Sequence, residues 1–124
     1  MTREEGPAPD AATVAELVLG AIDELKGVDV RTLDVRDQTS ITDTIIVVSG
    51  TSRRHVKSLA DRVLERAREA GIKPLGTEGE RGADWFLVDL GDVVVHVMSR
   101  EKRDFYNLEK LWSMHVDGSV AGSG

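Results

Sequence analysis

Four β-branched residues follow one another at positions 45–48, with the sequence Ile-Ile-Val-Val. Such residues favour extended backbone, and successive side chains of a strand point to opposite faces of its sheet. A strand that is apolar at every position is therefore buried on both faces. The run predicts a strand over residues 43–49 that is internal to its sheet or covered on both sides.

An amphipathic helix is predicted directly after this strand. Ser52 can cap its N-terminus, and Gly71 can end it with a positive φ. Its apolar residues recur at helical spacing: Val56, Leu59, Ala60, Val63, Leu64 and Ala67. The same spacing predicts an earlier helix that ends at Gly27, with the stripe Val14, Leu17, Val18, Ala21, Ile22 and Leu25.

The other predicted elements are mostly strands. Residues 30–35 form a strand, and residues 72–77 form a weak one before a loop marked by Gly76, Gly79 and Gly82. Residues 85–90 and 92–98 form a hairpin that turns at Gly91, and Ser99 caps a last helix. That helix would carry Phe105, Leu108, Leu111 and Trp112. The order α-β-β-α-β-β-β-α predicts an α/β fold of the α+β kind, a mixed β-sheet with flanking helices.

The chain has 124 residues, of which 40% are hydrophobic and 31% charged, a composition typical of one globular domain. We predict a single domain over residues 11–113, with flexible tails over 1–10 and 114–124. No apolar run approaches the roughly 20 residues of a membrane helix, and the N-terminus lacks the apolar stretch of a secretory signal. We therefore expect a cytoplasmic protein with no membrane partner.

The turn Ser49-Gly50-Thr51-Ser52 raises the question of nucleotide chemistry, because backbone N–H groups at a helix start can hold a phosphate. Arg53, Arg54 and His55 would add charge. The alternative, which we favour, is that Ser52 only caps the helix. Phosphoryl transfer also needs carboxylates close together to hold a divalent metal, and none follows the turn at a suitable spacing.

The sequence contains no motif for other catalytic or metal-binding chemistry. The chain has no cysteine, which excludes disulfides, zinc ribbons and thiol catalysis. No serine lies in a Gly-x-Ser-x-Gly turn, and the histidines at 55, 96 and 115 form no recognisable constellation. His96 alternates with valines on a predicted strand, where a structural or partly exposed histidine is commoner than a base. We therefore predict no catalytic residue, no metal and no cofactor, and favour a binding protein.

All aromatic residues fall in one stretch of the chain: Trp85, Phe86, Phe105, Tyr106 and Trp112. Trp85 and Phe86 are neighbours on a predicted strand and point to opposite faces, so at most one is plainly in the core. Trp and Tyr are enriched at protein interfaces. We predict a surface role for Trp85 and Tyr106, whereas Phe105 and Trp112 are equally well explained by packing of the last helix on the hairpin.

Charge is unevenly distributed in a chain whose net charge is −6. Residues 52–70 hold six Arg or Lys against three acids, whereas residues 75–92 hold five acids against Arg81 alone. Acids around an exposed aromatic surface would repel phosphates and attract a basic protein. We predict a basic protein as partner and interpret the basic helix as a solvated face, with RNA contact as the alternative.

Several ungapped blocks carry a specific resemblance: SITDTIIVVSGTSRRHVKSLADRV, GIKPLGTEG, ADWFLVDLGDVVVHVM and FYNLEKLW. From Val14 to Trp112 the chain resembles the ribosomal silencing factor family, also called the Iojap or RsfS family. The resemblance implies a nucleotidyltransferase-like fold. The missing metal carboxylates argue that its chemistry has been lost, so we predict that the protein is not an enzyme. The alternative function is a nucleotide-binding or residual nucleotidyltransferase domain acting through residues 49–52.

The resemblance also implies a partner, the large ribosomal subunit, bound through its ribosomal protein number fourteen on the subunit-joining face. Bound there, the protein would block docking of the small subunit and repress translation under nutrient limitation. It would be a monomer on the ribosome, with a homodimer when free and a minor contact with ribosomal RNA left open. The family's motif residues on the acidic and aromatic surface are the predicted contacts: Glu78, Asp84, Trp85, Asp89, His96, Met98, Tyr106 and Leu108.

Overall fold

The structure, a computed structural model, describes residues 10–79 and 84–106. Apart from Asp10, which caps the first helix by accepting a hydrogen bond from the Thr13 backbone, the predicted tails lie outside these residues. The elements follow the predicted order. They are α1 (Ala11–Glu24), β1 (Val28–Asp34), β2 (Thr44–Gly50), α2 (Arg53–Glu69), β3 (Gly76–Gly79), β4 (Trp85–Asp89), β5 (Val93–Ser99) and α3 (Arg100–Tyr106).

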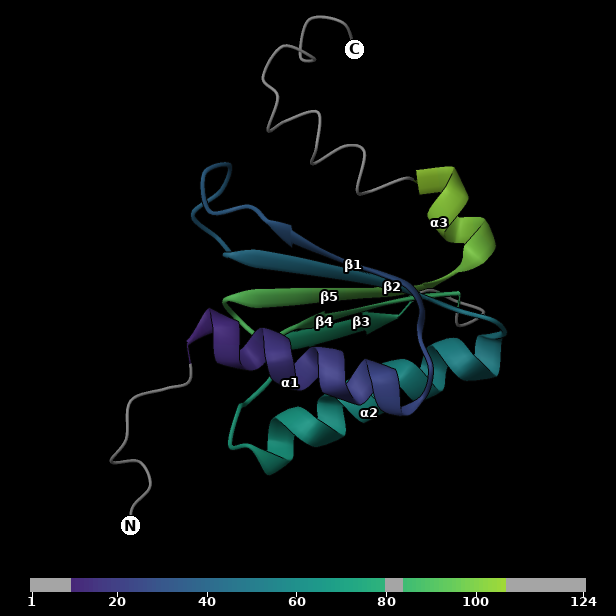
Figure 1. Ribbon diagram of the computed structural model, residues 1–124, viewed down its shortest axis with the longest axis horizontal. Helices are drawn as coiled ribbons and strands as arrows, with labels where there is room; N and C mark the ends of the chain where they lie inside the picture. The colour runs from purple at the N-terminus through teal and green to yellow at the C-terminus, as the bar shows by residue number, and fades with distance from the viewer. Residues whose placement is uncertain (1–9, 80–83, 107–124) are drawn as a thin grey trace, which may run out of the picture.

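The strands form one five-stranded mixed sheet in the order β1-β2-β5-β4-β3 (Figure 1). β2 and β5 are parallel, whereas β1 with β2, β4 with β5 and β3 with β4 are antiparallel. A parallel pair needs a long crossover connection, which the segment from α2 to β4 supplies. β2 is thus an interior strand, and its residues Ile45 to Val48 are at most 4% exposed, which confirms the prediction for the aliphatic run.

α1 and α2 lie along one face of the sheet, and α3 lies beyond the opposite face at the end where β5 stops (Figure 1). The larger apolar core fills the space between these two long helices and the sheet. Ile22 of α1, Leu59 and Val63 of α2, and Val95 and Val97 of β5 are among its fully buried members. Burial of side chains of this size contributes about 1.5–3 kcal/mol each.

A smaller apolar cluster lies on the other face of the sheet. Val47 of β2 and Met98 of β5 are fully buried in it, and Trp85 of β4 packs against it. Phe86 instead packs against the larger core. The prediction that Trp85 and Phe86 point to opposite faces is therefore confirmed, and both are only partly buried.

The predicted helix caps and glycine turns occur at the expected residues. Ser52 Oγ accepts a hydrogen bond from the backbone of His55 at 3.0 Å and caps α2. Gly71, after α2, has φ +80°, and Gly91, in the turn between β4 and β5, has φ +94°. Ser99 Oγ accepts from the backbone of Lys102 at 3.1 Å, as expected of the cap of α3.

The third strand departs from the prediction. A weak strand is predicted over residues 72–77 with a glycine-rich loop after it, but β3 occupies Gly76–Gly79, so the predicted position is wrong. Gly79 pairs with Phe86 of β4, and a Cβ on Gly79 would lie 2.5 Å from the Phe86 ring. Glycine leaves room for this ring, so a strand forms where the glycine spacing indicates a loop.

Candidate functional site

The register of the sheet brings distant residues together on the face that points away from α1 and α2, which we call the distal face. One row across it runs from Glu78 of β3 through Leu87 of β4 and His96 of β5 to Val47 of β2. Side chains alternate along a strand, so Trp85 and Asp89 share this face with Leu87, and Met98 shares it with His96. Most of the predicted contact residues therefore meet on one surface: Glu78, Trp85, Asp89, His96 and Met98.

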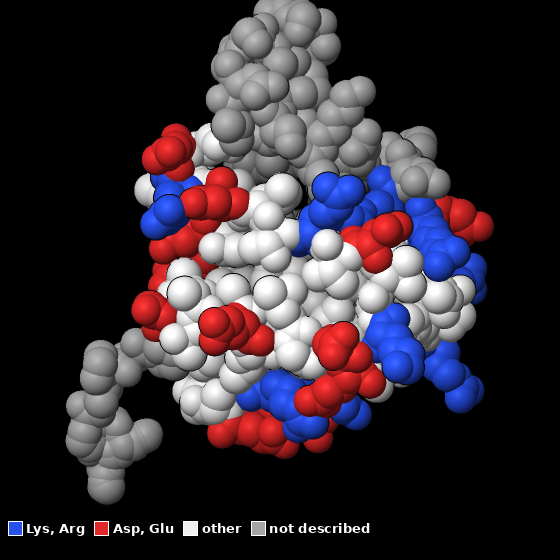
Figure 2. Space-filling model, in the orientation of Figure 1, with Lys and Arg blue, Asp and Glu red and all other residues white. Residues whose placement is uncertain are grey.

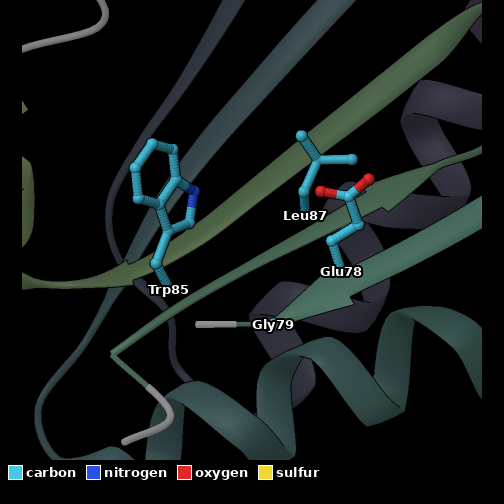
Figure 3. Close-up of a pocket in the computed structure, with 4 residues that line it drawn as sticks. All are labelled: Glu78, Gly79, Trp85 and Leu87. Carbon is cyan, nitrogen blue, oxygen red and sulfur yellow. The ribbon is translucent and has the colours of Figure 1, made fainter. Parts of the chain in front are cut away.

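A shallow hollow of about 310 Å³ lies on this surface. Among the described residues it is lined by Glu78, Gly79, Trp85 and Leu87. Figure 3 shows the side chains of Trp85, Leu87 and Glu78 rising from the same side of the sheet, with the Glu78 carboxylate beside Leu87. The hollow thus joins an indole ring, an aliphatic side chain and an acid, which suits a partner with an apolar group next to a basic one.

Leu87 also lines this hollow and is absent from the predicted contacts. It lies between Trp85 and Asp89 on β4, and it pairs with both Glu78 and His96 on the neighbouring strands. Its alternation with Trp85 along a predicted strand was the signal that could have found it.

His96 holds a defined position beneath this surface. The indole Nε1 of Trp85 donates a hydrogen bond to Nδ1 of His96 at 3.2 Å. The two rings are tilted by 44°, with their centroids 5.8 Å apart. Burial lowers the pKa of His96 from 6.5 to about 4, because an imidazolium would lose its hydration there. His96 is therefore neutral at pH 7, and its unprotonated Nδ1 can accept the hydrogen bond from the indole N–H.

Met98 and Asp89 contribute to the face in different ways. Met98 is fully buried and pairs with Trp85 across β4 and β5, so it supports the indole from below. Asp89 accepts a hydrogen bond from the Gly91 backbone at 2.9 Å, which holds the turn between the two strands. Its carboxylate thereby stays at the rim of the distal face.

Asp84 lies apart from this group. Its carboxylate is 3.4 Å from the guanidinium of Arg53, and its backbone oxygen accepts a hydrogen bond from the Ser99 backbone at 2.8 Å. It lines a second hollow, of about 280 Å³, that includes Gly50, Thr51, Ser52 and Arg100. Tyr106 is the last residue of α3, but its side chain and all of Leu108 lie outside what the structure describes.

The second hollow includes the turn for which the sequence leaves nucleotide binding open. The backbone N–H of Thr51 donates to Nδ1 of His55 at 2.8 Å, and the backbone N–H of His55 donates to Ser52 Oγ. Nε2 of His55 in turn lies 2.7 Å from the carbonyl of Leu25. Two of the N–H groups at this turn are thus already used within the protein, which confirms Ser52 as a cap. The described residues contain no cluster of acids or histidines able to hold a metal ion.

The basic charge of α2 is largely engaged within the protein. Glu24, at the end of α1, accepts hydrogen bonds from Arg66 and Arg62, and these bonds hold its pKa below the usual value. Lys57 pairs with Asp61 one turn later at 2.9 Å. The interpretation of α2 as an ordinary charged helix face accords with these contacts.

Charge nevertheless differs between the two ends of the sheet. Figure 2 shows mostly acidic side chains where the connection between β1 and β2 lies, and mostly basic ones around α3 and the start of α2. Asp43 of that connection donates its backbone N–H to the carbonyl of Asp92 at 3.0 Å, so the connection and the turn between β4 and β5 share one end. The acidic region is therefore wider than the hairpin predicted from the sequence.

Comparison with known proteins assigns this chain to a family. The sequence model described as "Ribosomal silencing factor during starvation" matches residues 8–121. The chain belongs to the ribosomal silencing factor, or RsfS, family. It is 44% identical over 100 residues to the ribosomal silencing factor RsfS of Haemophilus influenzae, covering 81% of this chain and 98% of the relative.

More distant and structural comparisons agree with this. A mouse protein named "Mitochondrial assembly of ribosomal large subunit protein 1" is 32% identical over 89 residues, covering 69% of this chain and 39% of the relative. A crystal structure of a Chromobacterium violaceum protein is similar with a TM-score of 0.82 and 41% identity, over 85% of this chain and 88% of that one. Among the described residues of our protein, no helix is long and apolar enough to cross a membrane.

Proposed function

We propose that this protein silences translation by occupying the large ribosomal subunit and excluding the small one. Its distal face binds ribosomal protein number fourteen on the subunit-joining surface, as a monomer and in the cytoplasm. No bond is made or broken, so the effect is stoichiometric and rises with the number of copies of the protein. The family match supports the ribosome as the partner, and the geometry of the distal face supports the mode of binding.

The observation that carries the mode of binding is the convergence on the distal face. Glu78, Trp85 and His96 come from three strands, yet the register places them within one row of each other. Trp85 is partly buried, with Met98 beneath it and its N–H bonded to His96. A large aromatic ring fixed beside an acid is the arrangement expected of an interface anchor with a polar rim.

Two carboxylates of this face favour a basic partner. Glu78 is exposed at the hollow, and Asp89 lies at the rim near the acidic end of the sheet. Such carboxylates speed the approach of a lysine- or arginine-rich surface and weaken that of a phosphate backbone. Asp84 contributes less, because Arg53 already faces its carboxylate.

A density gradient tests the proposal directly. Purified protein is mixed with isolated large subunits, small subunits are added under magnesium conditions that favour joining, and protein and particles are followed across the gradient. We expect the protein to sediment with the large subunits and the joined ribosomes to decrease in proportion to the protein added. Full joining with the protein left at the top of the gradient would contradict the proposal.

A pair of variants links the result to the distal face. Trp85→Ala removes the anchor, and Arg68→Ala changes an exposed residue of α2 on the helix side of the sheet. The first variant should leave joining intact, and the second should block it as the wild-type protein does. If both variants blocked subunit joining equally, the binding surface would not include Trp85.

The rival function is nucleotide binding in the hollow beside Gly50 and Arg53. The hollow has two arginines in its lining, but Asp84 and Glu101 line it as well and would repel a phosphate. Calorimetry with nucleoside triphosphates and magnesium separates the two functions. Heat of binding that is lost in Arg53→Ala, together with full subunit joining, would favour the rival.

A further inference from the structure

Trp85 and His96 are diagonal neighbours on the antiparallel strands β4 and β5. Trp85 pairs directly with Met98, and His96 pairs directly with Leu87. Diagonal side chains on one face are within reach of each other when one of them is aromatic. Here the two rings form a hydrogen bond of 3.2 Å from the indole Nε1 to the imidazole Nδ1.

The chemistry of the two rings fixes their roles. An indole N–H can only donate, and an imidazole nitrogen can accept only when it carries no proton. Nδ1 of His96 therefore carries no proton, and in the neutral ring the proton is on Nε2. The uncharged side chains of Val47 and Leu87 flank His96 across the sheet, which agrees with a neutral ring.

Trp85 makes both an apolar and a polar contact on this face. The buried Met98 and Val47 lie in the apolar cluster against which its ring packs, and His96 tethers its polar edge. The hydrophobic effect is not directional, so it does not by itself specify which way the polar edge of the ring faces. The hydrogen bond selects one orientation, in which the indole forms one wall of the hollow beside Glu78.

We infer that His96 is a positioning residue, which acts on the ribosomal partner through Trp85 instead of touching it. This inference rests on the proposed function, because it concerns the same face and the same partner. An anchor that is already oriented loses less side-chain freedom on binding. Loss of the acceptor therefore weakens the complex without removing any atom that meets the partner.

Two substitutions of His96 separate positioning from contact. Asparagine carries Oδ1 on Cγ, where histidine carries Nδ1, so His96→Asn keeps an acceptor near the same place. Leucine has the same branching at Cγ but no polar atom, so His96→Leu removes the acceptor. Circular dichroism and thermal unfolding establish that both variants are folded before their binding is compared.

The hydrogen bond is read first in the free protein. The chain has two tryptophans, and Trp85→Phe assigns the indole N–H resonance of Trp85 in a ¹⁵N-labelled sample. We expect slow exchange of this proton with water in the wild type and in His96→Asn, and fast exchange with a shifted resonance in His96→Leu. Fast exchange in the wild type would overturn the inference without involving the ribosome.

Binding to isolated large subunits is the second measurement. One net hydrogen bond predicts that His96→Leu weakens binding about fivefold, chiefly through a faster dissociation rate, while His96→Asn stays within about twofold of wild type. In the Trp85→Phe background, which has no indole N–H, the same two substitutions should differ little. Such a double-mutant cycle isolates the pair from other effects of each change.

The outcomes are distinct. Equal weakening by asparagine and leucine would show that the imidazole itself meets the partner, and an undiminished effect in the Trp85→Phe background would show the same. Wild-type affinity in His96→Leu would mean that the tether is not needed. Failure of the wild-type protein to bind large subunits would instead refute the proposed function, while the proton-exchange result would still test the tether.

Discussion

Arg103 donates a hydrogen bond from a guanidinium nitrogen to Oγ of Ser49 at 3.1 Å, and this contact joins α3 to the end of β2. Arg103 is 8% exposed and Ser49 is 1% exposed. A buried charged group that loses a hydrogen-bond partner retains the cost of its lost hydration. We predict that Ser49→Ala lowers the free energy of unfolding by about 1–3 kcal/mol, measured by urea denaturation.

The control for this substitution is Ser40→Ala, at an exposed position in the connection between β1 and β2. It removes the same hydroxyl from a residue in contact with water and should change stability by less than about 0.5 kcal/mol. If the two substitutions lowered the free energy of unfolding equally, the hydrogen bond between Arg103 and Ser49 would not stabilise the fold. α3 ends at Tyr106, a predicted contact, so Ser49→Ala should also weaken binding to large subunits.

Gly50 lies where the chain has no room for a side chain. A Cβ at this position would come within 2.8 Å of the backbone nitrogen of Val56, and backbone of a helix does not give way as a side-chain tip does. We predict that Gly50→Ala lowers the free energy of unfolding by about 1–3 kcal/mol, measured by thermal unfolding. A Cβ on Gly20, in α1, would instead meet nothing within 4 Å. Gly20→Ala should stabilise the protein by about 0.5–1 kcal/mol, and the opposite order would contradict the packing.

The features that the sequence predicts well are local. The aliphatic run from Ile45 to Val48, the cap at Ser52 and the glycine turn at Gly91 each depend on residues close in the chain. Alternation along one strand was also enough to separate Trp85 from Phe86. In each case the physical cause lies within a few residues, so its pattern is visible without the fold.

The features that the sequence does not predict depend on pairing between distant segments. The position of β3 follows from the fit of the Phe86 ring against Gly79, and the ion pair of Asp84 depends on Arg53 of another element. The tether between Trp85 and His96 exists only because β4 and β5 pair in one register. A shift of that register by one residue would send His96 to the helix side of the sheet.

Trp85 is expected to dominate the affinity for the large subunit. Aromatic anchors of this kind contribute about 2 kcal/mol or more, so Trp85→Ala should weaken binding about 30-fold. The loss should appear mainly as faster dissociation, because an apolar anchor acts after the partners have met. Surface plasmon resonance on immobilised large subunits measures both rates. If the folded variant dissociates no faster than Arg68→Ala, Trp85 is not the anchor.

Glu78 is expected to act on the approach of the partner. Its carboxylate is exposed beside the hollow, so Glu78→Gln should lower the association rate about two- to threefold at low salt and reduce its dependence on salt. Asp61→Asn, on α2, is the control of equal charge and should have a smaller effect. Asp84→Asn should also have less effect, because Arg53 already faces that carboxylate. Three equal changes would mean that net charge, not the distal face, steers the encounter.

We expect His96 to make the free energy of unfolding depend on pH. Its pKa is about 4 in the folded protein against 6.5 for an ordinary histidine, so the unfolded chain takes up a proton at a higher pH than the folded one. The stability that depends on neutral His96 is complete above pH 6.5 and falls as the pH drops toward 4. A shift of this size, in a partly buried group, corresponds to about 2–3 kcal/mol.

His96→Asn isolates this contribution, because asparagine does not titrate and all carboxylates titrate in both proteins. The free energy of unfolding of the wild type, minus that of the variant, should decrease by about 2–3 kcal/mol between pH 6.5 and pH 4 in urea denaturation. The indole N–H of Trp85 should begin to exchange faster only at the lower end of this range, where the folded protein itself takes up the proton. A difference that stays constant with pH would mean that the folded state accepts a proton on His96 as readily as the unfolded chain, so that neither burial nor the hydrogen bond from Trp85 favours the neutral ring.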